Sequence, residues 1–427
     1  MKWSRVRLKG FREPCVAVLL YHHVDPLDAI TPEVFDWQMK YLHTQGYQVI
    51  SLTELVQVMK GRQRASRNSV VLTFDDGFLN TWVYAYPILK KYRFKATLFM
   101  ITGLAGNPTT PPRFNLEDLK MQKCQEKDLY RRGDLFHPSP LDRENNPDAE
   151  LPDFLTWKEL KIMEESGIMD VQSHGRYHQY AYRSEKIKEF HIPAFRNRKW
   201  PIEGDCRLGT PMYERGSALA VRKYAGDPLL AEALIHYVNQ NGGEAFFRDK
   251  EKAIVDKTLM EVVAAYKAGH RIEGSYEDEA SWRERVRSEL LQSKQDIERH
   301  LGKRCRYLAW PWGEYDQAGL ELAREVGYEA TVTTDRGANT PGSDVMRIKR
   351  FKIWKASKLA FVSGLFIHTH APLARSYARL RILDLTPPTP FPGREGESWA
   401  VAIPKFLLPG AGKGARGHKR QDRKNPP

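Results

Sequence analysis

The sequence lacks paired cysteines. Its four cysteines, Cys15, Cys124, Cys206 and Cys305, stand far apart, and no CxxC pair occurs. This spacing excludes a zinc ribbon and a thioredoxin-like redox site, because both need two close thiols. Scattered single thiols are typical of a reducing compartment, with one long-range disulfide as the alternative.

Long apolar runs are also missing. The longest run near the N-terminus, residues 15–20, is shorter than the roughly 7–15 apolar residues of a signal-peptide core, and no small-x-small cleavage site follows it. No stretch approaches the roughly 20 apolar residues that a helix needs to cross a bilayer. We therefore expect a cytoplasmic protein.

Positive charge is in excess. The chain has 427 residues and a net charge of +14, which can indicate nucleic acid, an anionic membrane or an acidic glycan as a partner. Residues 410–427 hold six Lys or Arg against one Asp, within a Pro- and Gly-rich stretch at 387–427 that we expect to be a disordered tail. No motif supports nucleic-acid binding, so we expect no such partner. Peripheral contact of the tail with an anionic membrane is the remaining hypothesis.

Strands and helices are predicted to alternate. Apolar, β-branched runs typical of buried strands occur at residues 16–20, 47–52, 69–74, 96–101, 168–173, 306–311 and 328–334. Helical patterns lie between them, at residues 32–42, 84–92 and 155–166, and a further helix opens at Thr53. This order predicts an α/β fold with a mainly parallel sheet wrapped by helices.

Two segments interrupt the alternation. Residues 107–150 are rich in Pro and charge, and we expect a surface insertion there. Residues 179–282 contain helical patterns around 229–239 and 250–268 in otherwise basic sequence, so we expect a second, mostly helical insertion. We therefore predict one catalytic domain over residues 14–380 that these two segments interrupt.

Four polar residues each follow a predicted strand. Asp75 and Asp76 follow one strand, and His174 and His178 follow another. An Asp-Asp-Gly turn by itself more often caps a helix, and a lone HxxxH is more often two surface histidines. Together they predict one site, because carboxyl ends of parallel strands share an edge. A carboxylate and two imidazoles there are the ligands of a catalytic zinc-type metal with open positions.

Three motifs resemble those of a known family. Residues 70–77, Val-Val-Leu-Thr-Phe-Asp-Asp-Gly, resemble the first motif of the polysaccharide deacetylases (carbohydrate esterase family 4, NodB-like domain). Residues 173–178 resemble their second motif, and residues 310–313 their third, which builds a wall of the substrate groove. The resemblance covers roughly residues 14–105, 153–180 and 284–350, and it implies a distorted (β/α) barrel of about seven strands.

The resemblance also implies roles for the motif residues. Asp76, His174 and His178 are the implied ligands of a divalent metal, zinc first, with nickel, cobalt or iron as alternatives. Asp75 is the implied general base. The residues implied to bind substrate are Trp310, Pro311, Trp312 and Gly313.

The implied reaction removes N-acetyl groups from a glycan, or a glycan precursor, built of N-acetylglucosamine-type sugars. A cytoplasmic location favours a nucleotide- or lipid-linked precursor. One alternative is hydrolysis of another acyl or C–N bond, such as an O-acetyl ester or a small N-acyl compound. The other is a catalytically silent glycan-binding protein on the same fold.

The family's acid, usually a histidine in a late Leu-x-x-His motif, has two candidates here. Residues 19–22 fit this pattern at the front of the chain. Residues 20–24 resemble the poly-N-acetylglucosamine deacetylases, in which the barrel is circularly permuted and the acid motif comes first. Residues 365–368 fit the pattern of an unpermuted chain. We favour His22 and keep His368 as the alternative.

One position departs from the family pattern. Family members often carry an arginine two residues before the proline of the third motif, where it holds the catalytic aspartate, and this chain has Ala309 there. Arg306 and the pair Arg347 and Arg350 are candidates to replace it, and a differently tuned aspartate is the other alternative. Asp335 is a candidate to orient the histidine acid.

Overall fold

The computed structural model describes residues 14–66, 68–131, 153–193, 207–248 and 250–382. The chain divides into two units, residues 1–383 and 384–427. The predicted tail at 387–427 lies outside the described residues, so its expected disorder and membrane contact stay predictions.

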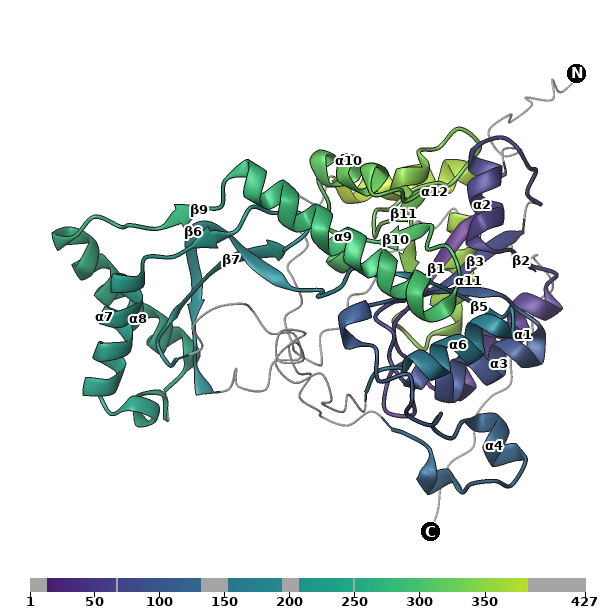
Figure 1. Cartoon of the computed structure of the whole chain (residues 1–427), viewed down its shortest axis with the longest axis horizontal. Helices are drawn as coiled ribbons and strands as arrows, with labels where there is room; N and C mark the ends of the chain where they lie inside the picture. Colours follow the sequence, from purple (N-terminus) through teal and green to yellow (C-terminus); the bar gives the residue numbers. More distant parts are fainter. Residues whose placement is uncertain (1–13, 67, 132–152, 194–206, 249, 383–427) are drawn as a thin grey trace, which may run out of the picture. The chain divides into compact units, whose positions relative to one another are not determined.

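Seven parallel strands form the body of the first unit (Figure 1). Their order is β11-β10-β5-β4-β3-β1-β12, so each strand from β3 to β11 lies beside the one before it in this series along the chain, and β12 pairs with β1. Their bounds are β1 Ala17–Tyr21, β3 Ser69–Phe74, β4 Ala96–Met100, β5 Met169–Ser173, β10 Tyr307–Ala309, β11 Ala330–Val332 and β12 Phe351–Lys352. The short β2 (Gln48–Val49) pairs with β3 outside this path.

The two ends of the sheet meet. Ile348, just before β12, forms a parallel bridge with Val332 of β11, while β12 itself pairs with β1. The sheet therefore curls into a distorted (β/α) barrel of seven strands, as the resemblance of the motifs implies. The strand that carries His22 at its carboxyl end comes first in the chain, in the order expected of a permuted barrel.

Alternate residues of the strands belong to two different cores. Val18 and Val71 cluster with the buried face of α2 (Leu52–Met59). Leu19 and Leu72, the next residue of each strand, cluster with the outer helices. Because neighbouring residues of a strand point to opposite faces, the first cluster fills the inside of the barrel and α2 closes its end.

The outer helices begin where the sequence predicts a cap. Thr31 Oγ1 accepts the Val34 N–H at 3.3 Å, and Pro32 occupies the first turn of α1 (Pro32–Thr44). Thr156 and Glu159 form a capping box at the start of α6 (Trp157–Glu165). The remaining helices of the barrel are α3 Tyr86–Tyr92, α4 Leu116–Lys120, α9 Glu279–Leu301, α10 Gln317–Glu325, α11 Lys358–His368 and α12 Ala371–Ile382.

The predicted helix at 84–92 is confirmed and extends further forward. A π-helical turn, Thr81–Ala85, precedes α3 directly, and Pro87 lies in the first turn of α3. Proline is tolerated there because the first turn of a helix has no backbone acceptor for its missing N–H.

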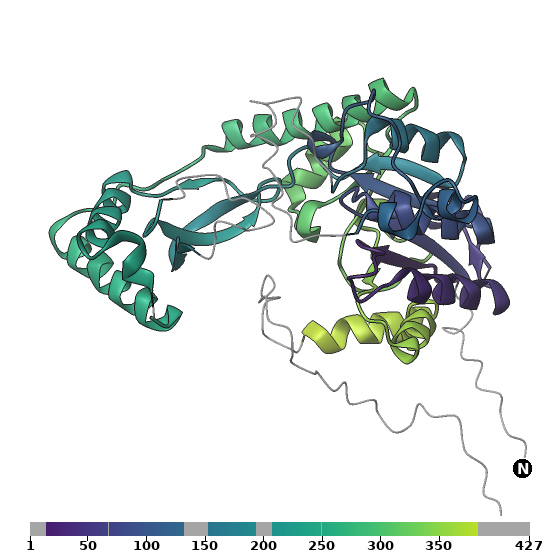
Figure 2. The same ribbon diagram turned by 90° about the horizontal axis from the view of Figure 1, so that it is seen from below.

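The second insertion combines strands with the two predicted helices (Figure 2). Helices α7 (Pro228–Gln240) and α8 (Lys252–Gly269) pack side by side around their own apolar core. A long antiparallel hairpin, which the sequence analysis did not predict, precedes them; it consists of β6 Tyr180–Phe190 and β7 Pro211–Ser217. A second short pair consists of β8 Tyr224–Ala225 and β9 Ser275–Tyr276.

The first insertion is tied to the barrel in its described part. Arg113 makes two side-chain hydrogen bonds to the buried Glu159, of 2.9 and 2.6 Å. Its carbonyl oxygen accepts the Trp82 indole N–H at 2.7 Å. Residues 132–152 lie outside the described part of the chain.

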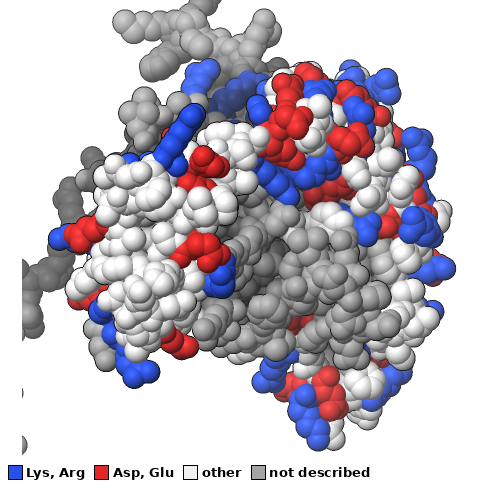
Figure 3. All heavy atoms as spheres, turned by 60° about the vertical axis from the view of Figure 1, so that its left-hand side comes forward, with Lys and Arg blue, Asp and Glu red and all other residues white. Residues whose placement is uncertain are grey.

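Charge of both signs is spread over the surface. On the face drawn in Figure 3, Lys and Arg alternate with Asp and Glu among the coloured atoms, and neither sign gathers into one large patch. Within the described ranges, no helix is both long and apolar enough to cross a membrane.

Candidate metal centre

Asp76, His174 and His178 converge at one end of the barrel. Asp76 follows β3 and the two histidines follow β5, with only β4 between these strands. His174 Nε2 lies 3.3 Å and His178 Nε2 lies 3.6 Å from Asp76 Oδ1. One ligand atom from each side chain lies within 4.8 Å of the other two, and all three residues are buried. The structure therefore brings together the three ligands that the sequence predicts.

The backbone of the Asp-Asp-Gly turn explains how two adjacent aspartates face one cavity. Asp76 has a φ of +74° and Gly77 a φ of +81°, so the chain leaves the strand geometry in which neighbours point to opposite faces. A Cβ on Gly77 would lie 1.9 Å from Met100 Sδ, so only glycine fits. His178 also has a positive φ, +53°. Backbone strain of this kind is common at functional sites.

A backbone carbonyl orients His174. Its Nδ1 lies 2.9 Å from the carbonyl oxygen of Ala309. Because a carbonyl can only accept, Nδ1 carries a hydrogen, which leaves Nε2, on the side of Asp76, as the nitrogen that can bind a metal. This second contact is the usual way in which a protein orients a metal-binding imidazole.

The donor set fits a divalent cation. Asp76 Oδ1 is buried and has no hydrogen-bond partner, although an unpaired buried carboxylate oxygen is costly. Burial opposes ionisation of Asp76, but His174, His22 and His178 together hold its pKa well below the usual value. Burial, followed by His174, lowers the pKa of His178 to about 3, so its imidazole is neutral. A cation would supply the missing partner, and these ligand types suit zinc.

Arg350 holds the other aspartate. Its guanidinium donates to both Asp75 oxygens, with N···O distances of 2.7 and 2.8 Å, and both side chains are buried. Burial alone would raise the pKa of Asp75, but Arg350 and His174 bring it below the usual value. The other candidates lie elsewhere: Arg306 pairs with Glu329, and Arg347 donates to Gln317.

The two histidine candidates for the acid have different surroundings. His22 follows β1, the neighbour of β3, and interacts electrostatically with Asp76 and Asp75. Burial lowers its pKa to about 4. His368 lies on α11, where its ring stacks on Phe351 at 4.4 Å. Its pKa is also lowered to about 4, first by burial and then by Arg336, with no contribution from the site carboxylates. The structure thus places His22, and not His368, within electrostatic reach of Asp75 and Asp76.

The residues of the third motif lie in two different environments, the buried core and the candidate metal centre. Trp312 contacts His178 with ring centroids 4.4 Å apart and stacks on Tyr180 at 4.0 Å. Trp310, in contrast, is fully buried and donates its indole N–H to Thr331 Oγ1 at 3.0 Å. The expectation that its side chain binds substrate is therefore corrected, because it has no exposed surface. Pro311 is buried too, and Gly313 is partly exposed.

The described hydrogen bonds of Asp335 do not involve His22. Its carboxylate accepts a hydrogen bond from the Tyr315 hydroxyl, and its N–H donates to Thr333 Oγ1 at 3.1 Å. These contacts tie the loop after β11 to the loop after β10.

Sequence reasoning missed Glu289 of α9. Its Oε1 accepts the backbone N–H groups of Arg176 and Tyr177, at 3.3 and 3.2 Å. One turn further along α9, Ser293 Oγ lies 2.7 Å from Ser173 Oγ. Glu289 is buried, and burial raises its pKa. This helix therefore fixes the loop that carries both histidine ligands.

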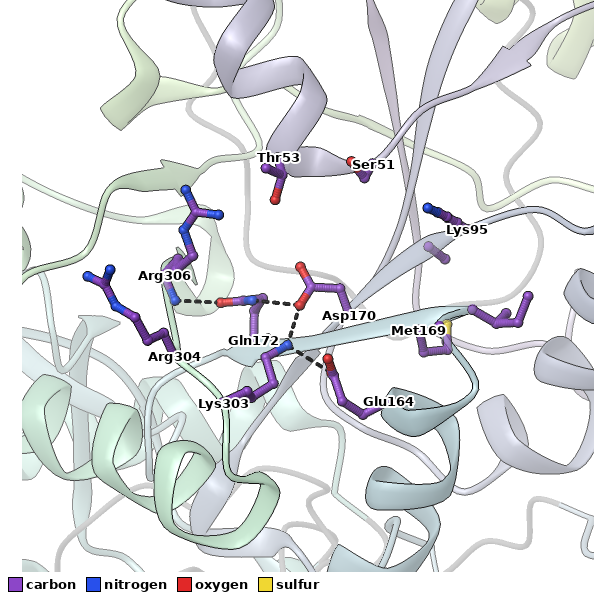
Figure 4. Close-up of a pocket in the computed structure, with 13 residues that line it drawn as sticks. Ser51, Thr53, Lys95, Glu164, Met169, Asp170, Gln172, Lys303, Arg304 and Arg306 are labelled. Carbon is purple, nitrogen blue, oxygen red and sulfur yellow. Dashed lines mark hydrogen bonds and ion pairs between the residues drawn. The ribbon is translucent and has the colours of Figure 1, made fainter.

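A cavity of about 370 Å³ lies at the opposite end of the barrel (Figure 4). It opens at the amino ends of β5 and β10, whereas the histidines follow the carboxyl end of β5. Lys303 lies between Glu164, at 2.8 Å, and Asp170. Paired charges at the amino end of a barrel are typical of a stabilising role rather than a catalytic one.

Comparisons with known proteins agree with the motifs. A family model described as polysaccharide deacetylase matches residues 62–192 and 229–331, more than half of the chain. YxkH of Bacillus subtilis (strain 168) is 37% identical over 92 residues, which are 21% of this chain and 33% of that protein.

Two further relatives share a name. The poly-beta-1,6-N-acetyl-D-glucosamine N-deacetylase of Escherichia coli (strain K12) is 21% identical over 306 residues, 70% of this chain and 30% of that protein. The protein of the same name from Staphylococcus aureus (strain MSSA476) is 32% identical over 106 residues, 25% of this chain and 34% of its own length. The chain thus spans about a third of the length of the curated relatives it matches.

Among solved structures, a de-N-acetylase from Aggregatibacter actinomycetemcomitans superposes with a TM-score of 0.49 at 16% identity. The superposition covers 82% of this chain and 99% of that one.

Proposed function

This chain belongs to the polysaccharide deacetylase family, and on that premise we propose that it is a metal-dependent hydrolase that removes N-acetyl groups from a glycan. The observation that carries the proposal is the meeting of Asp76, His174 and His178 beside an ionised Asp75. Two relatives are named as deacetylases of poly-β-1,6-N-acetyl-D-glucosamine. Their names support N-acetylglucosamine as the sugar.

We assign the metal ligands to Asp76, His174 and His178, with zinc as the first choice and nickel, cobalt or iron as alternatives. These residues would hold a divalent cation, which would supply Lewis-acid chemistry: polarisation of the acyl carbonyl and a lower pKa for a nearby water. Asp76 and His174 lie within two residues of the ends of β3 and β5, and the Ala309 carbonyl orients His174, so this chain presents these donors in a defined arrangement.

Asp75 is the proposed general base. It would take the proton of the attacking water, and Arg350 keeps it ionised at neutral pH by binding both of its oxygens. Its Oδ2 also lies 3.8 Å from His174 Nε2, on the side of the metal ligands. The carboxylate is thus held where a water beside the ligands would be in reach.

His22 is the proposed acid. Burial keeps its imidazole neutral in the resting protein, so it must gain a proton before it can protonate the departing amine. The proton that Asp75 takes from water is a source, and the charges of Asp75 and Asp76 favour protonation of His22. Trp312 is partly exposed beside His178 and rests on the buried Tyr180, so its ring suits the apolar face of a sugar.

The test is acetate release from a panel of substrates. The panel contains β-1,6- and β-1,4-linked N-acetylglucosamine oligomers and an O-acetylated glycan, each with and without chelator. We expect acetate from an N-acetylated oligomer, loss of activity with chelator, and recovery on addition of zinc. Release from the O-acetylated glycan alone would indicate an esterase, and glycan binding without any release would indicate a silent binding protein.

Two single substitutions separate the proposed roles of the aspartates. Asp76→Asn should lose both bound metal and activity. Asp75→Asn should keep the metal but lower kcat by about 10²–10⁴-fold, the usual contribution of a general base. Asp36→Asn, at a partly exposed position that pairs with Lys91, is the matched control and should behave as the wild type. A fully active Asp76→Asn enzyme would contradict the assignment of Asp76 as a ligand of the catalytic metal.

A further inference from the structure

A second cavity lies within the insertion. Its volume is about 560 Å³, and strands β6 to β9 and the start of α7 line it. Four of its lining residues are tyrosines: Tyr182, Tyr213, Tyr224 and Tyr276. We call this cavity the tyrosine cleft.

The four rings form a continuous row. Ring centroids lie 5.3 Å apart from Tyr182 to Tyr213, 5.1 Å from Tyr213 to Tyr224, and 5.0 Å from Tyr224 to Tyr276. Tyr213 and Tyr224 are buried, whereas Tyr182 is partly exposed and Tyr276 is 50% exposed. The two ends of the row therefore offer aromatic surface, and the two middle rings support them.

These tyrosines are not needed to fill the core of the insertion. That core consists of Phe190, Phe246 and apolar residues of α7 and α8, and it contains none of the four rings. Residue 274 is nevertheless glycine, where a Cβ would lie 1.9 Å from the Tyr224 hydroxyl. The backbone thus makes room for a ring that core packing does not require, which indicates a binding surface.

Strand β6 connects the tyrosine cleft to the metal ligands. It begins two residues after His178, and Tyr180, its first residue, stacks on Trp312. Tyr182 lies two residues further on, so it shares the face of β6 on which Tyr180 lies. Two residues of a strand span roughly 7 Å. One chain of aromatic rings therefore leads from the proposed reaction site into the cleft.

The polar lining of the cleft indicates a neutral, hydroxyl-rich ligand. Arg207 pairs with Glu232, and Lys223 donates its backbone N–H to Glu277 Oε2 at 3.1 Å. The charged lining residues are Arg207 and Lys223 against Asp227, Glu232 and Glu277, so neither sign dominates enough to select a polyanion or a polycation. Aromatic faces beside a few placed polar groups are the usual means of holding an uncharged ligand of this kind.

We propose that the tyrosine cleft binds a second segment of the glycan, several sugars away from the unit that is deacetylated. This rests on the proposed function, since that function names the N-acetylglucosamine chain as substrate. The cleft then makes the enzyme prefer long chains to short ones.

The experiment uses the full chain with two defined probes, the β-1,6-linked N-acetylglucosamine hexasaccharide and disaccharide. The variants Tyr182→Ala and Tyr276→Ala change the two partly exposed ends of the row. Met260→Ala is the control, because Met260 is 44% exposed on α8 and does not line the cleft. Thermal unfolding confirms that each variant is folded.

Binding of the hexasaccharide to chelator-treated protein is measured by calorimetry, and kcat/KM is measured for both probes with zinc. For each tyrosine variant we expect about tenfold weaker hexasaccharide binding, the scale of one lost aromatic contact. The ratio of kcat/KM for hexasaccharide to disaccharide should fall by about the same factor. Met260→Ala should keep the wild-type affinity and ratio.

The results that would contradict the cleft proposal differ from those that would contradict the proposed function. If both tyrosine variants kept the wild-type hexasaccharide affinity and the wild-type ratio of kcat/KM values, the cleft proposal would be overturned. Acetate release by the same protein would still support the deacetylase function. Equal losses in Met260→Ala would also overturn it, because the effect would not be specific to the cleft. Absence of acetate release from both probes would count against the proposed function, whereas the calorimetric comparison would still decide on the cleft.

Discussion

Asp75 and Asp76 are adjacent in the sequence, but their different surroundings suit them to different roles. Both carboxylate oxygens of Asp75 accept hydrogen bonds from the Arg350 guanidinium, whereas the buried Oδ1 of Asp76 has no hydrogen-bond partner. One carboxylate is therefore neutralised by the protein, and the other is left for a cation. This difference supports the assignment of base to the first aspartate and ligand to the second.

Arg350 should matter for both turnover and stability. Arg350→Ala leaves a buried carboxylate unpaired, which should cost about 3–5 kcal/mol of folding free energy and lower kcat while bound metal is retained. Arg350→Lys keeps the charge but loses the two-armed geometry, so it should restore only part of kcat. Denaturant unfolding, metal content and steady-state kinetics measure these effects. Arg347→Ala, at a neighbouring arginine that donates to Gln317, is the control, and equal kcat in Arg350→Ala would contradict the assignment.

Metal binding should weaken in acid because of His174. Burial by itself would lower its pKa, but Asp75 and Asp76 raise it above the usual 6.5. In the metal-free protein the imidazole is therefore protonated below that raised pKa, and a metal must displace the proton. We expect zinc affinity to fall about tenfold per pH unit below it. Asp75→Asn should shift this fall to lower pH.

Competition with a chromophoric chelator over about pH 5.5 to 8 measures that fall. An affinity that stays constant over this range would show that His174 is not a ligand that competes with protons. Asp36→Asn, which removes a distant surface carboxylate, should leave the pH dependence as in the wild type.

Whole elements support the site from outside the motifs. Helix α9 contributes Glu289 and Ser293 to the loop that carries both histidines. The sequence contains a signal for this helix. Asp278 caps it, and Trp282, Val286 and Leu290 recur at helical spacing along its buried face. A helix could therefore have been predicted there, but its contact with the loop after β5 could not.

Glu289 is expected to act as a positioning residue. Glu289→Ala removes the acceptor of two backbone N–H groups, and we expect about 10–100-fold weaker zinc binding, the usual effect of a support behind the ligands. Glu289→Gln keeps a carbonyl acceptor and should restore most of the affinity. A purely structural role would lower thermal stability in both variants alike and leave zinc affinity unchanged.

The matched control for these variants is Glu284→Gln. Glu284 is exposed on the same helix, where it faces Arg287 at 3.8 Å. It should keep wild-type zinc affinity, which is measured by the same competition titration.

At the scale of the whole molecule, the site joins distant parts of one barrel. Its residues follow β1, β3, β5 and β10, and Arg350 directly precedes β12, so a metal held there binds the folded state and not the unfolded chain. Zinc at about 1,000 times its Kd should add about 4 kcal/mol to the free energy of unfolding. Thermal unfolding with zinc or with chelator measures this gain, and Asp76→Asn should show no zinc-dependent shift. A wild type with the same Tm in both conditions would argue against the site.

The sequence by itself determined an α/β fold with a parallel sheet and the three candidate ligands, while the family resemblance implied the barrel. Strand periodicity, caps and strand-end motifs are local, so the strand over residues 69–74, the α1 cap at Thr31 and the trio Asp76, His174 and His178 can be predicted from short stretches. The helices of the second insertion were predicted for the same reason. Its hairpin was missed because β6 and β7 pair across a long connection that no local pattern shows.

Only the tertiary structure decided the surroundings of those residues. Arg350 lies 275 positions from Asp75, and Glu289 lies 113 from Arg176, so no spacing in the sequence could select them. The burial of Trp310 and the tyrosine cleft likewise depend on which segments pack together. The physical reason is that periodicity and caps act within a few residues. Pairing, burial and cavities arise only when distant segments exclude water from one another.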